Sequence, residues 1–221
     1  MKKFALIITF FSFAFNSYAQ FTDIHDFDYG SDIPNSIGGY GSLTLYSNKL
    51  YGTIDNGSID YIFSINTDGT SFAHVYDFSS TMLSLCGAPL IVNNKIYGMM
   101  SAGIYKLNLD GTGYTLLHQF IGDTLDGYNA QGSLILIGNT LYGMTKLGGG
   151  NQTNLQGYGT IFSIDTSGSN FTLLHKFNMT QSYPYGSLIT SGNVLYGMTS
   201  GLATNTNGNV FSINTDGSNY T

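Results

Sequence analysis

The sequence repeats itself four times. A twelve-residue block that opens on glycine and closes on Tyr-Gly recurs without gaps, and two further blocks recur in the same order between its copies. The copies of the first block are residues 41–52, 87–98, 132–143 and 186–197. Corresponding blocks lie about 42 to 57 residues apart, a period typical of solenoids and β-propellers. A chain of this kind buries its core between neighbouring copies of one unit.

Each copy carries four strand signals, which we name a to d. An apolar run (strand a) and a Leu-Tyr-Gly segment (strand b) flank a two-residue turn of Asn, Gly or Ser, and Asn and Gly tolerate the positive φ that tight hairpins require. Segments such as Ile-Phe-Ser-Ile (strand c) and 171–177 (strand d) flank an Asn-Thr-Asp-Gly-like turn. Such meanders in tandem predict an all-β β-propeller of four-stranded antiparallel blades, with about four blades present.

The first residues have the pattern of a secretory signal. Lys2 and Lys3 precede an apolar run that ends at Phe15, and small residues occupy positions 17 and 19. We therefore expect a signal peptide over 1–19, propeller repeats over 20–221 and a secreted or cell-surface protein. The blade units fall near 41–78, 87–120, 132–177 and 186–221, with 21–27 as a leading outer strand.

The last residues begin a further d strand, in register with 170–172. We therefore expect an incomplete ring in a chain that continues beyond Thr221. The alternative is a closed four-bladed ring in which 21–27 completes the last sheet.

Composition narrows the possible partners. All 13 acidic residues are Asp and all seven basic residues are Lys, which gives a net charge of −6 and a pI near 4.7. Nucleic acid binding requires a basic face, so we expect no nucleic acid partner. After residue 15 no apolar run approaches the ~20 residues of a membrane helix, so we expect no membrane span.

The blocks also resemble a known family. The third unit, 132–177, carries LYGMT, a glycine-rich loop, GTIFSIDTSGS and FTLLHKF in that order. This pattern is similar to the GloVer tandem-repeat family of secreted bacterial proteins, also called choice-of-anchor repeat proteins. The resemblance implies an exported, kelch-like propeller and carries no catalytic residue onto this chain. The second unit departs most, because its glycine-rich loop shrinks to 101–103.

Loop length singles out one face of the propeller. The a–b turn always has two residues, and the c–d connection always takes nine steps between its aromatic residues. The b–c connection takes 11, 7, 19 and 14 steps, and the d–a connection 14, 9, 12 and 9. Because antiparallel strands alternate in direction, the variable connections should share one end of the blades. Loops of variable length commonly hold binding residues, although long surface loops also change in length at little cost in stability.

Aromatic and acidic residues of these loops are the candidate ligand-binding residues. Tyrosine rings and amides suit sugar rings and hydroxyls, while carboxylates suit Ca²⁺. If strand a is the innermost strand of each blade, the residues that precede the opening glycines would lie around the mouth of the central channel. Gln131 is one of these residues and joins the candidates for that reason. Ordinary polar loop surface is the alternative interpretation. The candidates are Tyr40, Tyr128, Tyr158, Tyr185, Gln131, Asp55, Asp60, Asp123 and Asp126.

No catalytic or metal-binding constellation emerges from the sequence. His25, His118 and His175 share one slot of strand d on separate blades, so they cannot converge on one metal ion, and a packing role is expected. Asp68 and Asp110 lie in the c–d turns, where carboxylates accept local backbone N–H groups. We expect no catalytic residue, no metal site and no cofactor, with Ca²⁺ supported only by the loop carboxylates.

Three functions remain. The leading hypothesis is an exported, non-enzymatic module that binds or adheres to a saccharide or cell-surface polymer through the variable loops. The second is a carbohydrate-active hydrolase or lyase that uses Asp and Tyr of the same face. The third is a structural spacer that displays a surface anchor.

Overall fold

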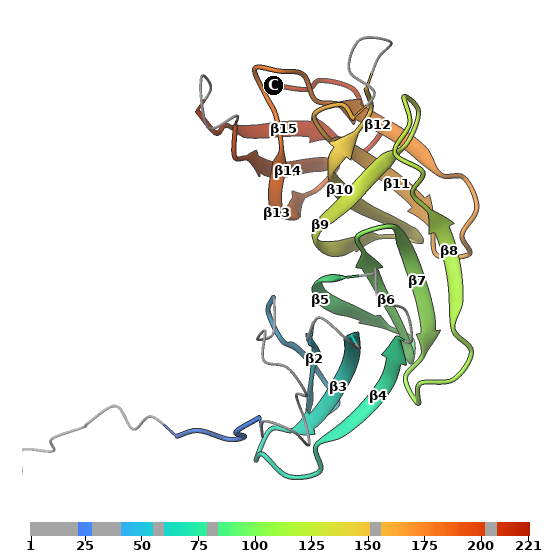
Figure 1. Ribbon diagram of the computed structural model, residues 1–221, viewed down its shortest axis with the longest axis vertical. Coiled ribbons are helices and arrows are strands. Elements are labelled where there is room, and N and C mark those ends of the chain that lie inside the picture. The colour runs from blue at the N-terminus through green and yellow to red at the C-terminus, as the bar shows by residue number, and fades with distance from the viewer. Residues whose placement is uncertain (1–21, 28–40, 55–59, 79–83, 151–155, 202–206) are drawn as a thin grey trace, which may run out of the picture.

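The protein is a set of four antiparallel sheets arranged along an open arc (Figure 1). The computed structural model describes residues 22–27, 41–54, 60–78, 84–150, 156–201 and 207–221, and these contain no helix. In every sheet the strands lie in chain order, so each sheet is a simple meander. The expected all-β propeller architecture of antiparallel blades is confirmed, and the described sheets do not close into a ring.

The four blades follow one another along the chain. Blade 1 is β1–β4, blade 2 is β5–β8, blade 3 is β9–β12 and blade 4 is β13–β15. In blade 4, Thr221 also exchanges two backbone hydrogen bonds of 2.9 Å with Ser212 of β15. The strands are β1 (Thr44–Tyr46), β2 (Lys49–Ile54), β3 (Asp60–Asn66), β4 (Ala73–Phe78), β5 (Leu85–Val92), β6 (Lys95–Met100), β7 (Gly103–Asn108), β8 (Thr115–Gln119), β9 (Gly127–Ile137), β10 (Thr140–Gly148), β11 (Thr160–Asp165), β12 (Thr172–Lys176), β13 (Pro184–Ser191), β14 (Val194–Thr199) and β15 (Val210–Asn214).

The turn residues explain why the strands end where they do. Asn93 and Asn94, between β5 and β6, have φ of 50° and 58°, and Gly138 (62°) holds the first turn position between β9 and β10. Such left-handed pairs match the twist of two antiparallel strands. In the c–d turn of blade 2, Asp110 Oδ1 accepts hydrogen bonds from the backbone N–H (3.0 Å) and the hydroxyl (2.7 Å) of Thr112. Asp68 accepts the same two hydrogen bonds from Thr70 in blade 1, so the turn-forming role expected of Asp68 and Asp110 is confirmed.

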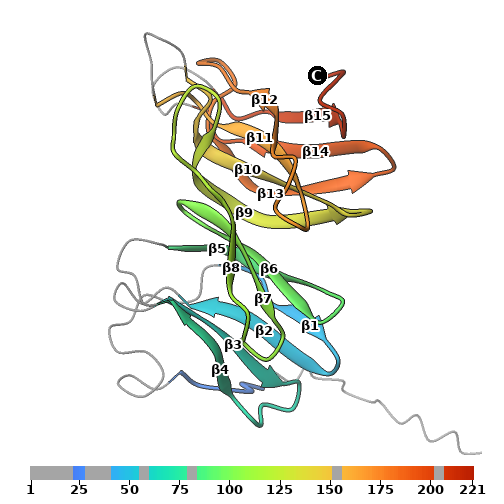
Figure 2. The same cartoon turned by 90° about the vertical axis from the view of Figure 1, so that its right-hand side faces the viewer.

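The fixed turns and the variable connections lie at opposite ends of the blades. The backbone N–H of Thr67 in a c–d turn donates to the carbonyl of Asn48 in an a–b turn at 3.2 Å, and each other blade repeats this bond. The a–b turns lie on the right in Figure 2. At the other end, the Ser101 N–H donates to the Ser84 carbonyl at 2.9 Å and joins a b–c to a d–a connection. The described variable connections therefore share one face, which we call the variable-loop face.

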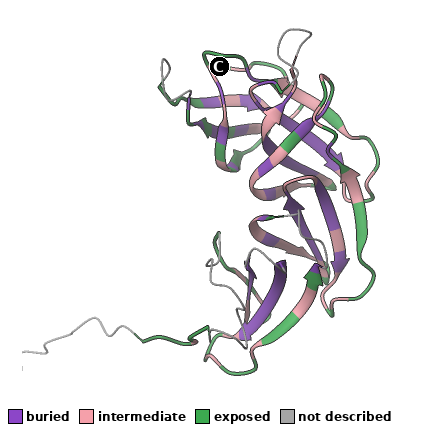
Figure 3. Ribbon diagram, in the orientation of Figure 1, coloured by how far each residue is buried: buried purple, intermediate pink, exposed green. Residues whose placement is uncertain are grey.

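The hydrophobic core lies between the blades. Tyr142, Met144 and Ile161 of blade 3 pack against Leu188 and Phe211 of blade 4, and all five side chains are buried. Burial is concentrated in the middle strands, whereas β4 and β8 at the rim are largely exposed (Figure 3). Because each such side chain contributes ~1.5–3 kcal/mol when fully buried, stability depends on the contact between neighbouring blades.

Glycines hold the inner strands together at the axis. The opening glycines Gly87 and Gly132 have φ of 67° and 70°, and a Cβ on Gly132 would lie 2.0 Å from the carbonyl oxygen of Gly186 in the next blade. A serine follows the glycine in blades 3 and 4, and the Ser133 N–H donates to the Ser187 hydroxyl at 2.8 Å. The repeated glycine is therefore a steric requirement of blade-to-blade contact.

Ring stacking joins the blades at the rim. The strand d position that His118 and His175 share contacts the aromatic residue that follows the c–d turn of the next blade. His118 lies 3.8 Å from Phe171, and His175 lies 3.8 Å from Tyr220, measured between ring centroids. The packing role expected for these histidines is confirmed.

The leading segment makes the same rim contact without forming a strand. His25 stacks on Phe72 of blade 1 at 4.5 Å, as a strand d residue does on the next blade. The segment 22–27 pairs with no strand in the described part of the chain.

Candidate functional site

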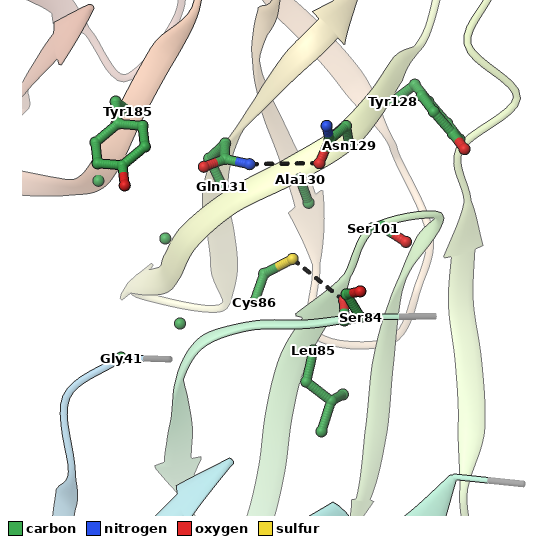
Figure 4. A pocket seen from close by; sticks show the side chains of 13 residues that line it. Gly41, Ser84, Leu85, Cys86, Ser101, Tyr128, Asn129, Ala130, Gln131 and Tyr185 are labelled. Carbon is green, nitrogen blue, oxygen red and sulfur yellow. Dashed lines mark hydrogen bonds between the residues drawn. The ribbon is translucent and has the colours of Figure 1, made fainter. Parts of the chain in front are cut away.

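A cavity of about 570 Å³ opens where the inner strands of the blades meet (Figure 4). Its walls come from the first residues of β5, β9 and β13, together with the short b–c connection of blade 2. The lining residues are Gly41, Ser84, Leu85, Cys86, Gly87, Ser101, Tyr128, Asn129, Ala130, Gln131, Gly132, Tyr185 and Gly186. All four opening glycines belong to this set. We call it the axial cavity.

An irregularity repeated in three inner strands builds the wall. In β9, Gln131 pairs with Met144 and the next pair is Ile135 with Tyr142, so two extra residues bulge out on the inner strand. The same shift follows Cys86 in β5 and Tyr185 in β13. A bulge bends a strand and redirects nearby side chains. The expectation that residues preceding the opening glycine line the axial mouth therefore holds for these three blades.

The lining offers amides, hydroxyls and exposed rings. Gln131 Nε2 donates to Asn129 Oδ1 at 3.4 Å, and Cys86 Sγ donates to the Ser84 carbonyl at 3.4 Å (Figure 4). Tyr185 and Tyr128 are 62% and 44% exposed. The described lining contains no carboxylate and no lysine. This wall can stack against a flat ring and can hydrogen-bond a neutral polar ligand.

Asp126 lies inside its own loop. Burial by itself raises the pKa of this carboxyl, but hydrogen bonds outweigh burial and hold the pKa below its usual value. The partners are His118 Nε2 at 3.1 Å and the backbone N–H groups of Ile121 (3.0 Å) and Gly127 (2.7 Å). The carboxylate thus fixes the d–a connection that leads into Tyr128 of the cavity wall.

The remaining candidates that the structure describes lie apart from the cavity. Asp123 accepts the Leu125 N–H at 2.7 Å in an exposed turn, and Asp60 is buried at the start of β3. Tyr158 packs against the core between blades 3 and 4. Tyr40 and Asp55 lie outside the described residues. The structure therefore brings Tyr128, Gln131 and Tyr185 together in one cavity lining and leaves Asp60, Asp123, Asp126 and Tyr158 outside it.

Sequence reasoning missed Ser84, Ser101 and Asn129 as lining residues. A signal existed for Ser101, because the b–c connection of blade 2 is the shortest of the four and brings that serine close to the axis. Asn129 adopts φ of 56° within β9, which no sequence pattern indicates. Among the residues described, no three His, Cys, Asp or Glu side chains gather into a group that could hold a metal ion.

A family assignment rests on the repeats just described. The model of the Gloeobacter/Verrucomicrobia repeat matches residues 93–221, more than half of the chain. The chain belongs to this repeat family. The resemblance inferred from the blocks is thereby confirmed. A search of curated proteins finds no significant match to this family member.

Solved structures share the fold at low sequence identity. A chain of a nidogen/laminin complex matches with a TM-score of 0.58 and 15% identity over 78% of this chain and 59% of that one. An oligogalacturonate lyase in complex with manganese matches at 0.55 and 13%, over 83% and 52%. The GH74 enzyme of Niastella koreensis matches at 0.53 and 20%, over 79% and 28%. The family member thus spans about three fifths or less of these propeller-like chains, and the likeness concerns the fold alone.

Proposed function

We propose that this repeat protein is an exported, non-enzymatic binding module that holds a saccharide segment of a cell-surface polymer in the axial cavity. The observation that carries the proposal is that Tyr128, Gln131 and Tyr185 all line the axial cavity. These three residues come from blades 3 and 4, and the full lining of the cavity draws on all four blades, so the site requires the assembled propeller.

The chemistry of the wall suits a neutral sugar. An exposed tyrosine such as Tyr185 offers a flat apolar face to a pyranose ring and a hydroxyl at its edge. The amides of Gln131 and Asn129 provide both a donor and an acceptor for neighbouring hydroxyls. The cavity volume of about 570 Å³ falls within the ~300–1,000 Å³ of small-molecule sites.

The same wall favours binding over catalysis. Hydrolysis of a glycosidic bond is usually performed by a pair of carboxyl groups on either side of that bond. The described lining offers none, and the nearby Asp126 already accepts three hydrogen bonds within its own loop. Release of new sugar ends from polysaccharides by the purified protein would favour the enzyme hypothesis instead.

The signal-like pattern of residues 1–19 supports export. Within the described ranges, the structure has no helix of the length and hydropathy needed to cross a bilayer. We propose that the protein acts outside the cell, where saccharide polymers are accessible. Binding through amides and rings requires no metal, so Ca²⁺ should be dispensable.

A glycan array with variants tests the proposal. We expect the protein to bind one class of neutral saccharide, in Ca²⁺ and in EDTA alike. Tyr185→Ala should lower affinity at least ~5-fold, because stacking of a flat ligand ring on an aromatic side chain is worth about 1–3 kcal/mol. Gln131→Ala should weaken binding similarly.

Met179→Ala is the matched control, since Met179 is exposed in a d–a connection of the variable-loop face but does not line the cavity. Its affinity should be unchanged. Absence of saccharide binding, or equal losses in all three variants, would contradict the proposal.

A further inference from the structure

The residue that precedes β13 has a strained backbone. Tyr183 adopts φ of 60°, in the left-handed region that a bulky side chain rarely enters. Asn129 has nearly the same φ, 56°, and like Tyr183 it lies three residues before the opening glycine of its blade. Asparagine tolerates this conformation, whereas tyrosine adopts it only at a cost in stability. The position therefore calls for a left-handed residue, and its backbone does not explain why that residue is tyrosine.

Hydrogen bonds hold Tyr183 in this conformation. Its N–H donates to the Tyr158 carbonyl at 2.9 Å, and its carbonyl accepts the backbone N–H (2.9 Å) and the hydroxyl (3.1 Å) of Ser200. The preceding side chain, Ser182, is fully buried, and its hydroxyl has no hydrogen-bond partner among the described residues. A buried hydroxyl without a partner also costs stability. Two unfavourable features thus occur in one short segment, and strain that the surrounding structure maintains is typical of binding sites.

The ring of Tyr183 contacts a lysine side chain. Lys146, in β10 of blade 3, is half-buried, and its Nζ lies 5.8 Å from the centroid of the Tyr183 ring. The Tyr158 ring lies 6.4 Å from the Tyr183 ring, measured between centroids. We call Lys146, Tyr158 and Tyr183 the lysine corner. It lies between blades 3 and 4 on the variable-loop face, because Tyr158 belongs to a b–c connection and Tyr183 to a d–a connection.

The ammonium group of the lysine corner has no polar partner in the described part of the chain. Lys176, at the end of β12, donates from Nζ to the carbonyl of Thr124, whereas Lys146 Nζ forms neither a hydrogen bond nor an ion pair there. An ammonium group carries three donors and no acceptor, and a half-buried charge is costly unless it is paired. The charge and the donors of Lys146 are therefore available to an anionic oxygen group of a ligand.

The lysine corner adjoins the axial cavity along the chain. Tyr183 is two residues before Tyr185, which lines the cavity, and two residues span at most ~7 Å of backbone. None of the three corner residues lines the cavity itself. A polymer that places one residue in the cavity can therefore present a neighbouring residue to Lys146.

We propose that the lysine corner binds an anionic oxygen group, a carboxylate or a sulfate, on the sugar residue next to the one in the axial cavity. The inference rests on the function proposed above and names its substrate class, a polymer in which a neutral and an acidic sugar residue are neighbours. Lys146 supplies the charge, and the Tyr183 ring holds the ammonium group in place. The net charge of −6 attracts no anion, so this selectivity depends on Lys146.

Matched oligosaccharides test the lysine corner. The probes are the neutral oligosaccharide selected on the array and two derivatives, which carry one carboxylate or one sulfate on the adjacent residue. At low salt we expect the wild type to bind at least one derivative about 3–10-fold more tightly than the neutral parent, and this gain should disappear in ~0.5 M NaCl. The derivative that shows the gain identifies the anion.

Removing the charge tests the role of Lys146. Lys146→Met keeps an apolar stem of similar length, so it should abolish the gain and leave affinity for the neutral parent unchanged. Lys49→Met is the matched control, because it removes the same charge beside an a–b turn at the opposite end of the blades. It should retain the gain.

Tyr183→Asn tests whether strain is maintained for binding. Asparagine occupies the corresponding position of blade 3, so the substitution relieves the left-handed backbone. The urea midpoint should stay unchanged or rise, while most of the gain for the acidic probe is lost. A lower midpoint would show that the ring of Tyr183 serves packing and would overturn the inference.

Tyr185→Ala separates the lysine corner from the axial site, and it should weaken the neutral and the acidic probes by the same factor. Binding of the neutral probe without a gain for either derivative, or a gain that survives Lys146→Met, would overturn the lysine corner alone. A gain that depends on Lys146, with affinities independent of Tyr185, would overturn axial binding alone. A wild type that binds none of the probes would overturn both.

Discussion

At the scale of single residues, close backbone contact at the axis determines which side chains are tolerated. Gly132 lies against the carbonyl of Gly186 at positive φ. Gly138 has a similar φ of 62° in a hairpin turn, where an added Cβ would meet no atom within 4 Å. Backbone strain would arise on substitution at both glycines, whereas steric crowding would arise only at Gly132. Comparing the two positions therefore distinguishes the two effects.

Alanine at these two positions tests the axial contact. Gly138→Ala should cost about 1 kcal/mol of unfolding free energy, the cost of a left-handed alanine. Gly132→Ala should cost at least ~2 kcal/mol more, because the added methyl group must push neighbouring blades apart. Urea unfolding followed by tyrosine fluorescence measures both. Equal losses would show that the blades do not meet through this glycine.

A half-buried imidazole predicts acid sensitivity. Burial lowers the pKa of His175, and its Nε2 has no hydrogen-bond partner among the described residues. The unfolded chain therefore binds a proton more readily, so the contribution of His175 to stability falls as the pH drops below ~6.5. We expect His175→Phe, which keeps the stack on Tyr220, to reduce the loss of unfolding free energy between pH 7.5 and 5.5. An unchanged loss would contradict this role.

At the scale of elements, a loop and a long strand place the cavity wall. β9 has 11 residues, whereas β5 and β13 have eight, and the extra length adds Tyr128 and Asn129 to the wall. The d–a connection before β9 is held by Asp126. The sequence places Asp126 and Asp123 together as loop carboxylates. It does not distinguish them, because the burial of Asp126 depends on its contact with His118 in the preceding strand d, and no local sequence pattern indicates that contact.

Replacing the two aspartates separates the roles within this loop. Asp126→Ala should lower the unfolding free energy by about 2–3 kcal/mol, since hydrogen bonds to a charged group contribute about 1.5–3 kcal/mol. It should also weaken saccharide binding by displacing Tyr128. Asp123→Ala removes one exposed turn contact and should cost under ~1 kcal/mol with binding intact. Urea unfolding and array binding provide the readouts, and an inverted ranking would contradict the assignment.

At the scale of the whole molecule, local requirements explain why so much of the fold could be predicted. Tight turns need residues such as Asn93 and Asn94, and close axial contact needs glycine, so both leave a periodic trace in the sequence. The convergence of Gln131 and Tyr185 follows from that period. The path of residues 22–27 does not, because their stacking on blade 1 depends on tertiary contacts and they form no strand pair among the described residues.

The measurement that most directly tests axial binding is a crystal structure with the saccharide selected on the array. We predict a sugar ring stacked on Tyr185, with its hydroxyls hydrogen-bonded to Gln131 and Asn129. A sugar bound over another part of the variable-loop face, with the axial cavity holding only solvent, would contradict axial binding.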